Sequence, residues 1–276
     1  MAKARYAHSV KACEPHLIKP FDNTDQGNPS VLIKLVDARH PLLGHKAVPL
    51  SVEIGKDFSI LVITGPNTGG KTVALKTIGL LSLMTQAGVP IPASPETRMP
   101  IFDGIFADIG DEQSIEQTIS SFSWHIGNIV RIIKNATKTS LVLLDELGTS
   151  TDPAEGSALA RGILLHFLGL KTLTVATTHY ADLKAFAHTT PGIQNASFDF
   201  NPVTLAPTYH MTVGIPGGSN ALAVAARLGV PPMIIEQAAK LLSQGTLDLE
   251  SMLSDIAAEK IKITEMRTLL EKKQKN

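Results

Sequence analysis

The chain contains 276 residues, with 25 basic and 25 acidic side chains and a hydrophobic fraction of 43%. This length suits one large domain or two modest ones, and the balanced charge excludes a strongly basic nucleic-acid surface across the whole chain. The single cysteine, Cys13, excludes an internal disulfide and a cysteine-based zinc site, which favours a reducing compartment. The first ten residues lack an export signal, and no uncharged apolar run reaches the length of a membrane span. We therefore expect a cytoplasmic protein with no membrane partner.

The N-terminal third contains the first clear strand. Residues Met1–Val10 are predicted to end a helix, and the Pro, Asn, Asp and Gly residues of Glu14–Ser30 predict a loop. β-branched and aliphatic residues predict a strand at Val31–Val36 and a buried one at Ile60–Thr64. A helix is expected to follow from Gly70 to about Ala87.

The middle of the chain alternates strands and helices. The prolines at positions 90, 92, 95 and 100 predict a loop. After it, we expect strands at Ile105–Ile109, Leu141–Leu144 and Leu173–Thr177, and helices at Ser114–Ile133 and Pro153–Leu168. Asp152 is expected to cap the second of these helices, with Pro153 in its first position. This alternation is typical of an α/β fold with a mostly parallel sheet flanked by helices, whereas Gln194–Val213 is predicted to pair in the antiparallel sense.

The C-terminal stretch is predicted to be helical. A helix over Ser219–Leu228 precedes a new one that Pro231 and Pro232 open. Beyond it, apolar residues occupy the a and d positions of heptads: Leu249, Met252, Ile256, Ile263, Met266 and Leu270. This spacing favours the start of a coiled coil, although an amphipathic helix packed on its own domain explains the same pattern.

Residues 65–72 match the pattern G-x-x-x-x-G-K-[ST], between an expected strand and an expected helix. They are Gly65, Pro66, Asn67, Thr68, Gly69, Gly70, Lys71 and Thr72. Glycines let successive backbone N–H groups point into one concavity at a helix N-terminus, where they bind a polyphosphate. Lys71 is expected to reach the β- and γ-phosphates, and the Thr72 hydroxyl to ligate Mg²⁺. The strand and helix on either side disfavour the simpler alternative, a glycine-rich turn with a chance lysine.

Asp145 and Glu146 directly follow the apolar strand Leu141–Leu144. Because open α/β folds bind ligands at the carboxyl edge of the sheet, we expect Asp145 to hold Mg²⁺ through water. Glu146 is expected to orient or deprotonate the attacking water, which indicates hydrolysis rather than transfer to a second substrate. A strand that ends in a solvated acidic turn is common by itself, but its pairing with the phosphate loop disfavours that alternative.

His179 follows the next expected strand, at the same edge of the sheet as Asp145. A histidine there can hydrogen-bond a γ-phosphate and couple it to the neighbouring loop. We therefore take His179 as a catalytic candidate beside Glu146 and Lys71. The other histidines, such as His125, have no metal-ligand spacing and are expected to be structural.

Together these motifs resemble the ATPase domain of the MutS family, which belongs to the ATP-binding-cassette (ABC) superfamily. The motifs are residues 65–72, Asp145–Gly148 and Thr177–Tyr180, in this order. Further segments resemble the type II bacterial paralogues of that family: Ala38–Leu43, Asp108–Gln117, Gly148–Gly156 and Ile215–Ala221. The resemblance covers about Ala2 to Gln244. It implies a P-loop NTPase fold of the ABC-ATPase type, with ATP and Mg²⁺ as its ligands.

The resemblance also assigns roles that spacing alone does not indicate. Ser120 and Ser121 match the signature segment, usually Ser-Thr-Phe, which caps the γ-phosphate of the opposing subunit and so implies a homodimer with composite ATP sites. Val73 is counted with the phosphate loop as a nucleotide contact. His45, or His40, is expected to pack against adenine.

The segment Gly148–Asp152 matches the loop that crosses the dimer interface. Type II members usually have Ala-Gly where Thr149 and Ser150 stand in this chain. Ser150 lacks the backbone freedom of glycine, so this departure puts the coupling between subunits in question.

The resemblance further implies an excised ATPase core in three parts. Residues 1–30 would be the end of a lever or core helix and a linker, 31–230 the ATPase domain, and 231–276 the C-terminal helices at the start of the coiled coil. ATP-driven closure of the dimer would control binding to branched DNA, in recombination suppression and DNA repair, or to stalled and collided ribosomes. Those contacts, and any nuclease activity, would lie mostly outside this segment.

Two other classes of ATPase remain as alternatives. An ABC-type transporter subunit would carry an LSGGQ-like signature, which this sequence lacks. A chromosome-condensing ATPase head would need a very long coiled coil between Thr72 and Asp145, and the connection is too short for one.

Overall fold

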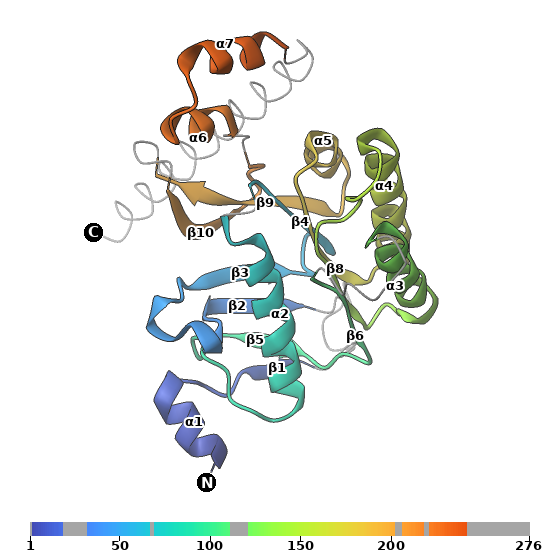
Figure 1. The fold of residues 1–276 in the computed structure, drawn as a ribbon. Helices are drawn as coiled ribbons and strands as arrows, with labels where there is room; N and C mark the ends of the chain where they lie inside the picture. The colour runs from blue at the N-terminus through green and yellow to red at the C-terminus, as the bar shows by residue number, and fades with distance from the viewer. Residues whose placement is uncertain are drawn as a thin grey trace, which may run out of the picture.

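The computed structural model describes residues 2–18, 32–66, 69–110, 121–201, 206–217 and 221–241. Its centre is a six-stranded sheet in the order β10-β9-β4-β8-β7-β6 (Figure 1). The strands are β4 (Ile60–Thr64), β6 (Ile105–Asp108), β7 (Leu141–Leu144), β8 (Leu173–Thr178), β9 (Ile193–Phe200) and β10 (Pro207–Val213). All neighbours pair in parallel except β9 and β10, which are antiparallel. The predicted α/β fold with a mixed, mostly parallel sheet is confirmed.

A smaller sheet, in the order β1-β5-β2-β3, accompanies the central one. Its strands are β1 (His16–Ile18), β2 (Ile33–Ala38), β3 (Leu50–Ile54) and β5 (Arg98–Pro100). Of these only β2 was predicted, and the loop predictions for His16–Ile18 and Arg98–Pro100 are wrong. Strands of three residues are too short to show a periodic pattern. They form here because each one pairs with a strand distant in the sequence.

Two hydrophobic cores lie on opposite faces of the central sheet. On β4, Leu61 and Ile63 pack with helix α2 (Lys71–Gln86) and the smaller sheet, whereas Ile60 and Val62 pack against helices on the other face. Every residue of β4 is therefore buried. Parallel strands covered on both faces are continuous apolar runs, which explains why the limits predicted for β4 and β7 match the structure.

Three helices cover the face of the sheet opposite α2 (Figure 1). They are α3 (Ser121–Asn135), α4 (Pro153–Leu170) and α5 (Ala181–Thr189). Asp152 caps α4 as predicted, because its carboxylate accepts hydrogen bonds from the N–H groups of Ala154 at 2.9 Å and Glu155 at 3.1 Å. The first residues of the helix predicted from Ser114 lie outside the described part of the chain. Helix α5 was not predicted.

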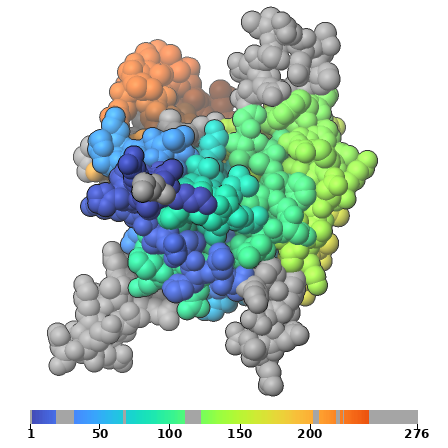
Figure 2. All heavy atoms as spheres, turned by 90° about the horizontal axis from the view of Figure 1, so that it is seen from below, coloured from blue at the N-terminus to red at the C-terminus, as the bar shows by residue number. Residues whose placement is uncertain are grey.

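The N-terminal helix α1 (Ala2–Val10) is attached to the end of α2. Lys3 Nζ donates hydrogen bonds to the carbonyl oxygens of Ala87 and Gly88, both at 2.9 Å. In Figure 2 the dark-blue N-terminal residues accordingly lie beside the teal surface of α2. A cation at a helix C-terminus is favourable because it complements the helix dipole.

Helices α6 (Ala221–Arg227) and α7 (Pro232–Leu241) occupy the two predicted helical segments after the sheet (Figure 1). The heptad positions from Leu249 to Leu270 lie outside the described residues, so the coiled coil remains a prediction, as do the three domain boundaries. None of the helices in the described ranges is long and apolar enough to cross a membrane.

Candidate nucleotide-binding site

The turn after β4 depends on backbone conformations that glycine adopts readily. Gly65 has a φ of 123° and Gly70 a φ of 97°, values at which most other residues are strained. Gly70 is the N-cap of α2, and Lys71 is its first residue. The first N–H groups of a helix have no acceptor within the helix and point outward from its N-terminus, which makes this position favourable for an anion. Asn67 and Thr68 lie outside the described residues.

Lys71 is buried beneath this turn, with 2% of its surface exposed. Its Nζ donates a hydrogen bond to the carbonyl oxygen of Gly65 at 2.5 Å. Burial lowers the pKa of Lys71; the charges of Glu146 and Asp145 act in the opposite direction, and Lys184 adds to the lowering. An anion bound at the turn would stabilise the charged form of this lysine.

The phosphate loop and the acidic pair meet at the carboxyl edge of the sheet. The Thr72 hydroxyl donates to Asp145 Oδ1 at 3.3 Å, and Asp145 is buried. A hydroxyl and a carboxylate are the hard oxygen ligands that Mg²⁺ prefers. The two residues predicted to hold the metal are therefore neighbours, and their donor atoms fit that ion.

Glu146 is held in a left-handed backbone conformation, with a φ of 49°. Its N–H donates to the Thr177 hydroxyl at 2.8 Å, and the N–H of Leu147 donates to the Thr177 carbonyl oxygen at 2.9 Å. Conformations of this kind cost about 1–2 kcal/mol outside glycine and concentrate at functional sites. The end of β8 thus fixes the turn that carries Glu146.

His179 lies one residue beyond β8, at the same edge as Asp145, and its side chain is exposed. Its ring centroid is 4.8 Å from that of Tyr180. The Tyr180 hydroxyl in turn donates to the carbonyl oxygen of Gly148 at 3.0 Å. The loop that starts at Gly148 is therefore tied to the strand end that carries His179.

The interface loop is closely packed where it starts. A Cβ on Gly148 would lie 2.5 Å from the carbonyl oxygen of Gly156, so no larger residue fits there. Ser150 has a φ of 69°, in the region that glycine occupies without strain. Ser121 is the first residue of α3, whereas Ser120 lies outside the described residues, so the structure leaves their predicted roles open.

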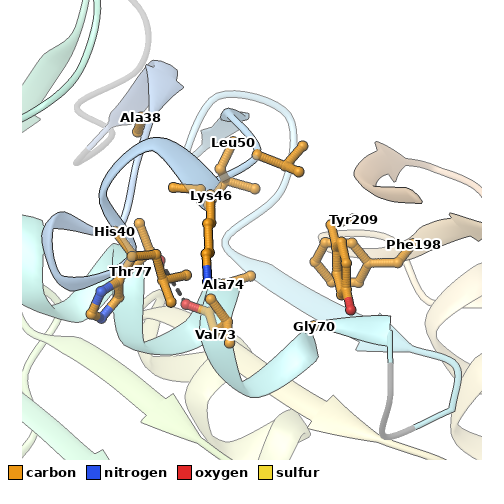
Figure 3. Close-up of a pocket in the computed structure, with 13 residues that line it drawn as sticks. Ala38, His40, Lys46, Leu50, Gly70, Val73, Ala74, Thr77, Phe198 and Tyr209 are labelled. Carbon is orange, nitrogen blue, oxygen red and sulfur yellow. Dashed lines mark hydrogen bonds between the residues drawn. The ribbon is translucent and has the colours of Figure 1, made fainter. Parts of the chain in front are cut away.

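A cavity of about 340 Å³ adjoins the phosphate loop (Figure 3). Gly70 and Val73 line it from the start of α2, and Phe198 and Tyr209 from strands β9 and β10. A 3₁₀ helix, Pro41–Lys46, contributes side chains to the opposite wall. The cavity combines mostly apolar walls with a position beside the polyphosphate turn, as expected for the base of a nucleotide.

His40 and Lys46 line this cavity, whereas His45 is exposed and is not among the lining residues. The main-chain N–H of Leu42 donates to His40 Nδ1 at 3.3 Å. Burial, and to a lesser degree the charge of Lys76, lower the pKa of His40, which favours its neutral form.

Sequence reasoning missed Tyr209, an aromatic residue that lies beside Gly70 of the phosphate turn. A Cβ on Gly70 would lie 3.2 Å from Tyr209 Cδ1. The register of β9 and β10 shifts between Pro207 and Met211, and Tyr209 has a φ of 61° within this bulge. Tyrosine is common in strands, so its presence in the sequence gives no sign of a site. Only the bulge of the folded strand marks Tyr209 as a candidate.

These features define the class of the protein. A phosphate loop follows the central strand of a mostly parallel sheet, and an acidic pair ends another strand at the same edge, which is the arrangement of P-loop nucleotide-binding domains. Residues 61–246 match the family model described as MutS domain V. The chain belongs to the MutS family.

Several relatives named Endonuclease MutS2 are similar to this chain. The protein of Thermomicrobium roseum is 54% identical, over 93% of this chain and 33% of its own length. The protein of Caldanaerobacter subterraneus subsp. tengcongensis is 51% identical, over 92% of this chain and 31% of its own length. The protein of Halothermothrix orenii is 47% identical, over 99% of this chain and 33% of its own length. The chain thus spans about a third of these curated relatives. Their name agrees with the predicted type II branch.

Proposed function

We propose that this domain binds ATP with Mg²⁺ and hydrolyses it to ADP and phosphate. The observation that carries the proposal is the meeting of Lys71, Thr72, Asp145 and Glu146 at one edge of the sheet. They come from two turns distant in the sequence and supply a cation, two metal ligands and a base. Together they supply the central groups for attack of water on a bound triphosphate.

Each residue has a distinct part in this reaction. Lys71 and the N–H groups at the start of α2 bind the β- and γ-phosphates. Thr72 and Asp145 would hold Mg²⁺, which when bound neutralises phosphate charge. Glu146 orients the attacking water and takes its proton, and its fixed main chain limits how far this carboxylate can move. His179 hydrogen-bonds the γ-phosphate from the neighbouring strand end.

The cavity beside Gly70 would hold the adenine base. Its apolar walls, with Val73 on α2 and Tyr209 and Phe198 on the β9–β10 hairpin, favour a flat aromatic ligand (Figure 3). We therefore assign the stacking contact to Tyr209 in place of His45. His40 and Lys46 would form the rim on the opposite side.

Family membership supports a wider role for the ATPase domain, which we place at residues 31–230. We propose a cytoplasmic homodimer in which Ser120 and Ser121 cap the γ-phosphate bound to the partner. Closure of this dimer would control binding to branched DNA or to stalled ribosomes. The relatives' name includes nuclease activity, which we assign to parts of those proteins that this chain does not match. Membership in the MutS family does not favour the transporter or chromosome-condensing alternatives.

Two variants test the proposal. Glu146→Gln keeps the shape of the side chain but removes the base, so we expect ATP binding to persist, turnover to stop and an ATP-dependent dimer to accumulate in sedimentation experiments. Lys71→Ala removes the buried cation and is expected to abolish ATP binding in calorimetry. Unchanged ATP affinity in Lys71→Ala would overturn the site. A strict monomer of Glu146→Gln at saturating ATP would overturn the composite dimer.

A further inference from the structure

Asp108 holds helix α3 against the end of the central sheet. It is the last residue of β6, and its carboxylate is almost completely buried. Asn128 Nδ2 donates to Asp108 Oδ1 at 2.9 Å, and His125 Nδ1 lies 2.9 Å from Asp108 Oδ2. Because an ionised carboxylate can only accept hydrogen bonds, the proton of the His125 contact belongs on Nδ1.

The main chain of the same aspartate is hydrogen-bonded to Asp145, the first residue of the acidic pair. The N–H of Asp145 donates to the carbonyl oxygen of Asp108 at 2.8 Å. His125 and Glu146 also line one small hollow of about 10 Å³, which is just enough for a water molecule. Helix α3 therefore lies beside the turn that carries Asp145 and Glu146. Asp108 joins the two, because its carboxylate is hydrogen-bonded to α3 and its carbonyl oxygen to Asp145.

These contacts lie in a defined part of α3. Helix α3 begins at Ser121, and His125 and Asn128 lie one and two turns further on. Both anchors thus lie within the half of the helix that starts with the signature segment, His125 near its beginning and Asn128 at its middle. Apolar residues of the same helix, such as Ile126, Ile129 and Ile132, pack into the core beside these hydrogen bonds.

Attachment of a helix through a buried carboxylate costs more free energy than attachment through apolar residues alone. Removing its charge from water costs free energy that only good hydrogen bonds offset. In return, two hydrogen bonds of fixed geometry define the position and rotation of the helix more closely than apolar contacts do.

We propose that His125 and Asn128 are positioning residues for ATP hydrolysis. Through Asp108 they fix the N-terminal half of α3, which begins at Ser121, relative to Asp145 and Glu146. The inference rests on the proposed function, because Ser121 acts on the nucleotide of the partner subunit only if the composite dimer forms. Neither residue needs to touch ATP.

The test compares His125→Phe with His125→Asn in steady-state ATP hydrolysis by the whole chain. Phenylalanine keeps the ring but removes the donor, so we expect kcat to fall by on the order of ten- to a hundredfold, with KM for ATP unchanged. Asparagine places an N–H donor close to the position of Nδ1 and should restore most of the lost kcat. Asn128→Ala removes the second anchor and should show the same selective loss. His166→Phe, on the exposed side of α4, is the matched control and should behave as wild type.

Three results would overturn the inference. The first is wild-type kcat in both His125→Phe and Asn128→Ala, and the second is an equal loss in His125→Phe and His125→Asn. The third is a rise in KM as large as the fall in kcat, which would mean that the contacts support ATP binding rather than the hydrolysis step. Failure of the wild-type chain to bind or hydrolyse ATP would instead reject the proposed function. If His125→Phe does not fold, Asn128→Ala decides the question by the same measurement.

Discussion

The Thr177 hydroxyl donates a hydrogen bond to Asp145 Oδ1 at 2.5 Å and accepts one from the N–H of Glu146 at 2.8 Å. One fully buried side chain on β8 therefore fixes both members of the acidic pair at the end of β7. Because Asp145 Oδ1 also accepts from Thr72, three segments of the chain meet at this oxygen. The position of the proposed metal ligand is thus set before any ligand binds.

Replacement of Thr177 should disturb the fold and the site together. Thr177→Val keeps the shape but leaves the half-buried N–H of Glu146 without its acceptor, so we expect the free energy of unfolding to fall by about 1–3 kcal/mol. ATP hydrolysis should fall as well, because Asp145 and Glu146 lose their common anchor. Urea unfolding and a phosphate-release assay measure the two effects. Thr177→Ser retains the hydroxyl and is the control; equal behaviour of the two variants would contradict the account.

Tyr209 should contribute to the affinity for the base and not for the phosphates. Stacking of a base on an aromatic side chain is worth about 1–3 kcal/mol by alanine substitution, so Tyr209→Ala should weaken ATP binding about five- to 150-fold. Binding of inorganic tripolyphosphate should not change, because that ligand has no base. Tyr209→Phe keeps the ring and serves as the control. Calorimetry with both ligands checks the prediction, and equal weakening of both would refute the stacking assignment.

We expect the folded chain to be less stable with Ser150 than with glycine at this position. Its φ of 69° strains a residue with a Cβ, so Ser150→Gly should raise the free energy of unfolding by up to about 1 kcal/mol. Lys171, the C-cap of α4, has a φ of 58° and offers a matched position away from the site. Lys171→Gly should stabilise by a similar amount in urea unfolding. A loss of stability in Ser150→Gly would show that the serine side chain outweighs the strain.

Asp103 should make stability depend on pH in the acid range. Burial acts to raise the pKa of Asp103, but hydrogen bonds from the hydroxyls of Thr137, Thr139 and Ser140 outweigh it, and the pKa lies below the ordinary value of 3.8. A lowered pKa contributes stability that is present above the ordinary value and lost as the pH falls through the folded-state value.

The variant Asp103→Asn lacks this titration. The wild type should therefore exceed the variant in unfolding free energy at pH 7, and the difference should shrink as the pH falls below about 4. Urea unfolding at a series of pH values measures the difference. An advantage of the wild type that does not change across this range would contradict the pKa shift.

The parts of the fold that could be predicted are those whose signal is local. Ile60–Thr64 and Leu141–Leu144 are apolar because both of their faces are covered, and Asp152-Pro153 marks the start of α4 through its own capping chemistry. Strand β1 and the short helix α5 were missed because tertiary contacts, and not local periodicity, stabilise them. Their sequences alone carry no strong preference.

The candidate site likewise contains some residues that the sequence predicts and others that only the fold brings together. Lys71, Thr72, Asp145 and Glu146 lie in motifs with strict spacing, so their chemistry could be predicted from the sequence. Tyr209 and the Asp108–His125 contact depend on a strand bulge and on the position of a helix against a sheet. Side chains brought together by such long-range geometry leave no pattern in a single sequence.

A crystal structure with a non-hydrolysable ATP analogue and Mn²⁺ in place of Mg²⁺ tests the central claim most directly. The account predicts the triphosphate on the turn between Gly65 and Thr72, within reach of Lys71. The anomalous signal of the metal should lie next to Thr72 Oγ1 and on the side of Asp145. A turn that stays empty or filled by side chains at saturating analogue, or a triphosphate bound elsewhere, would contradict the account.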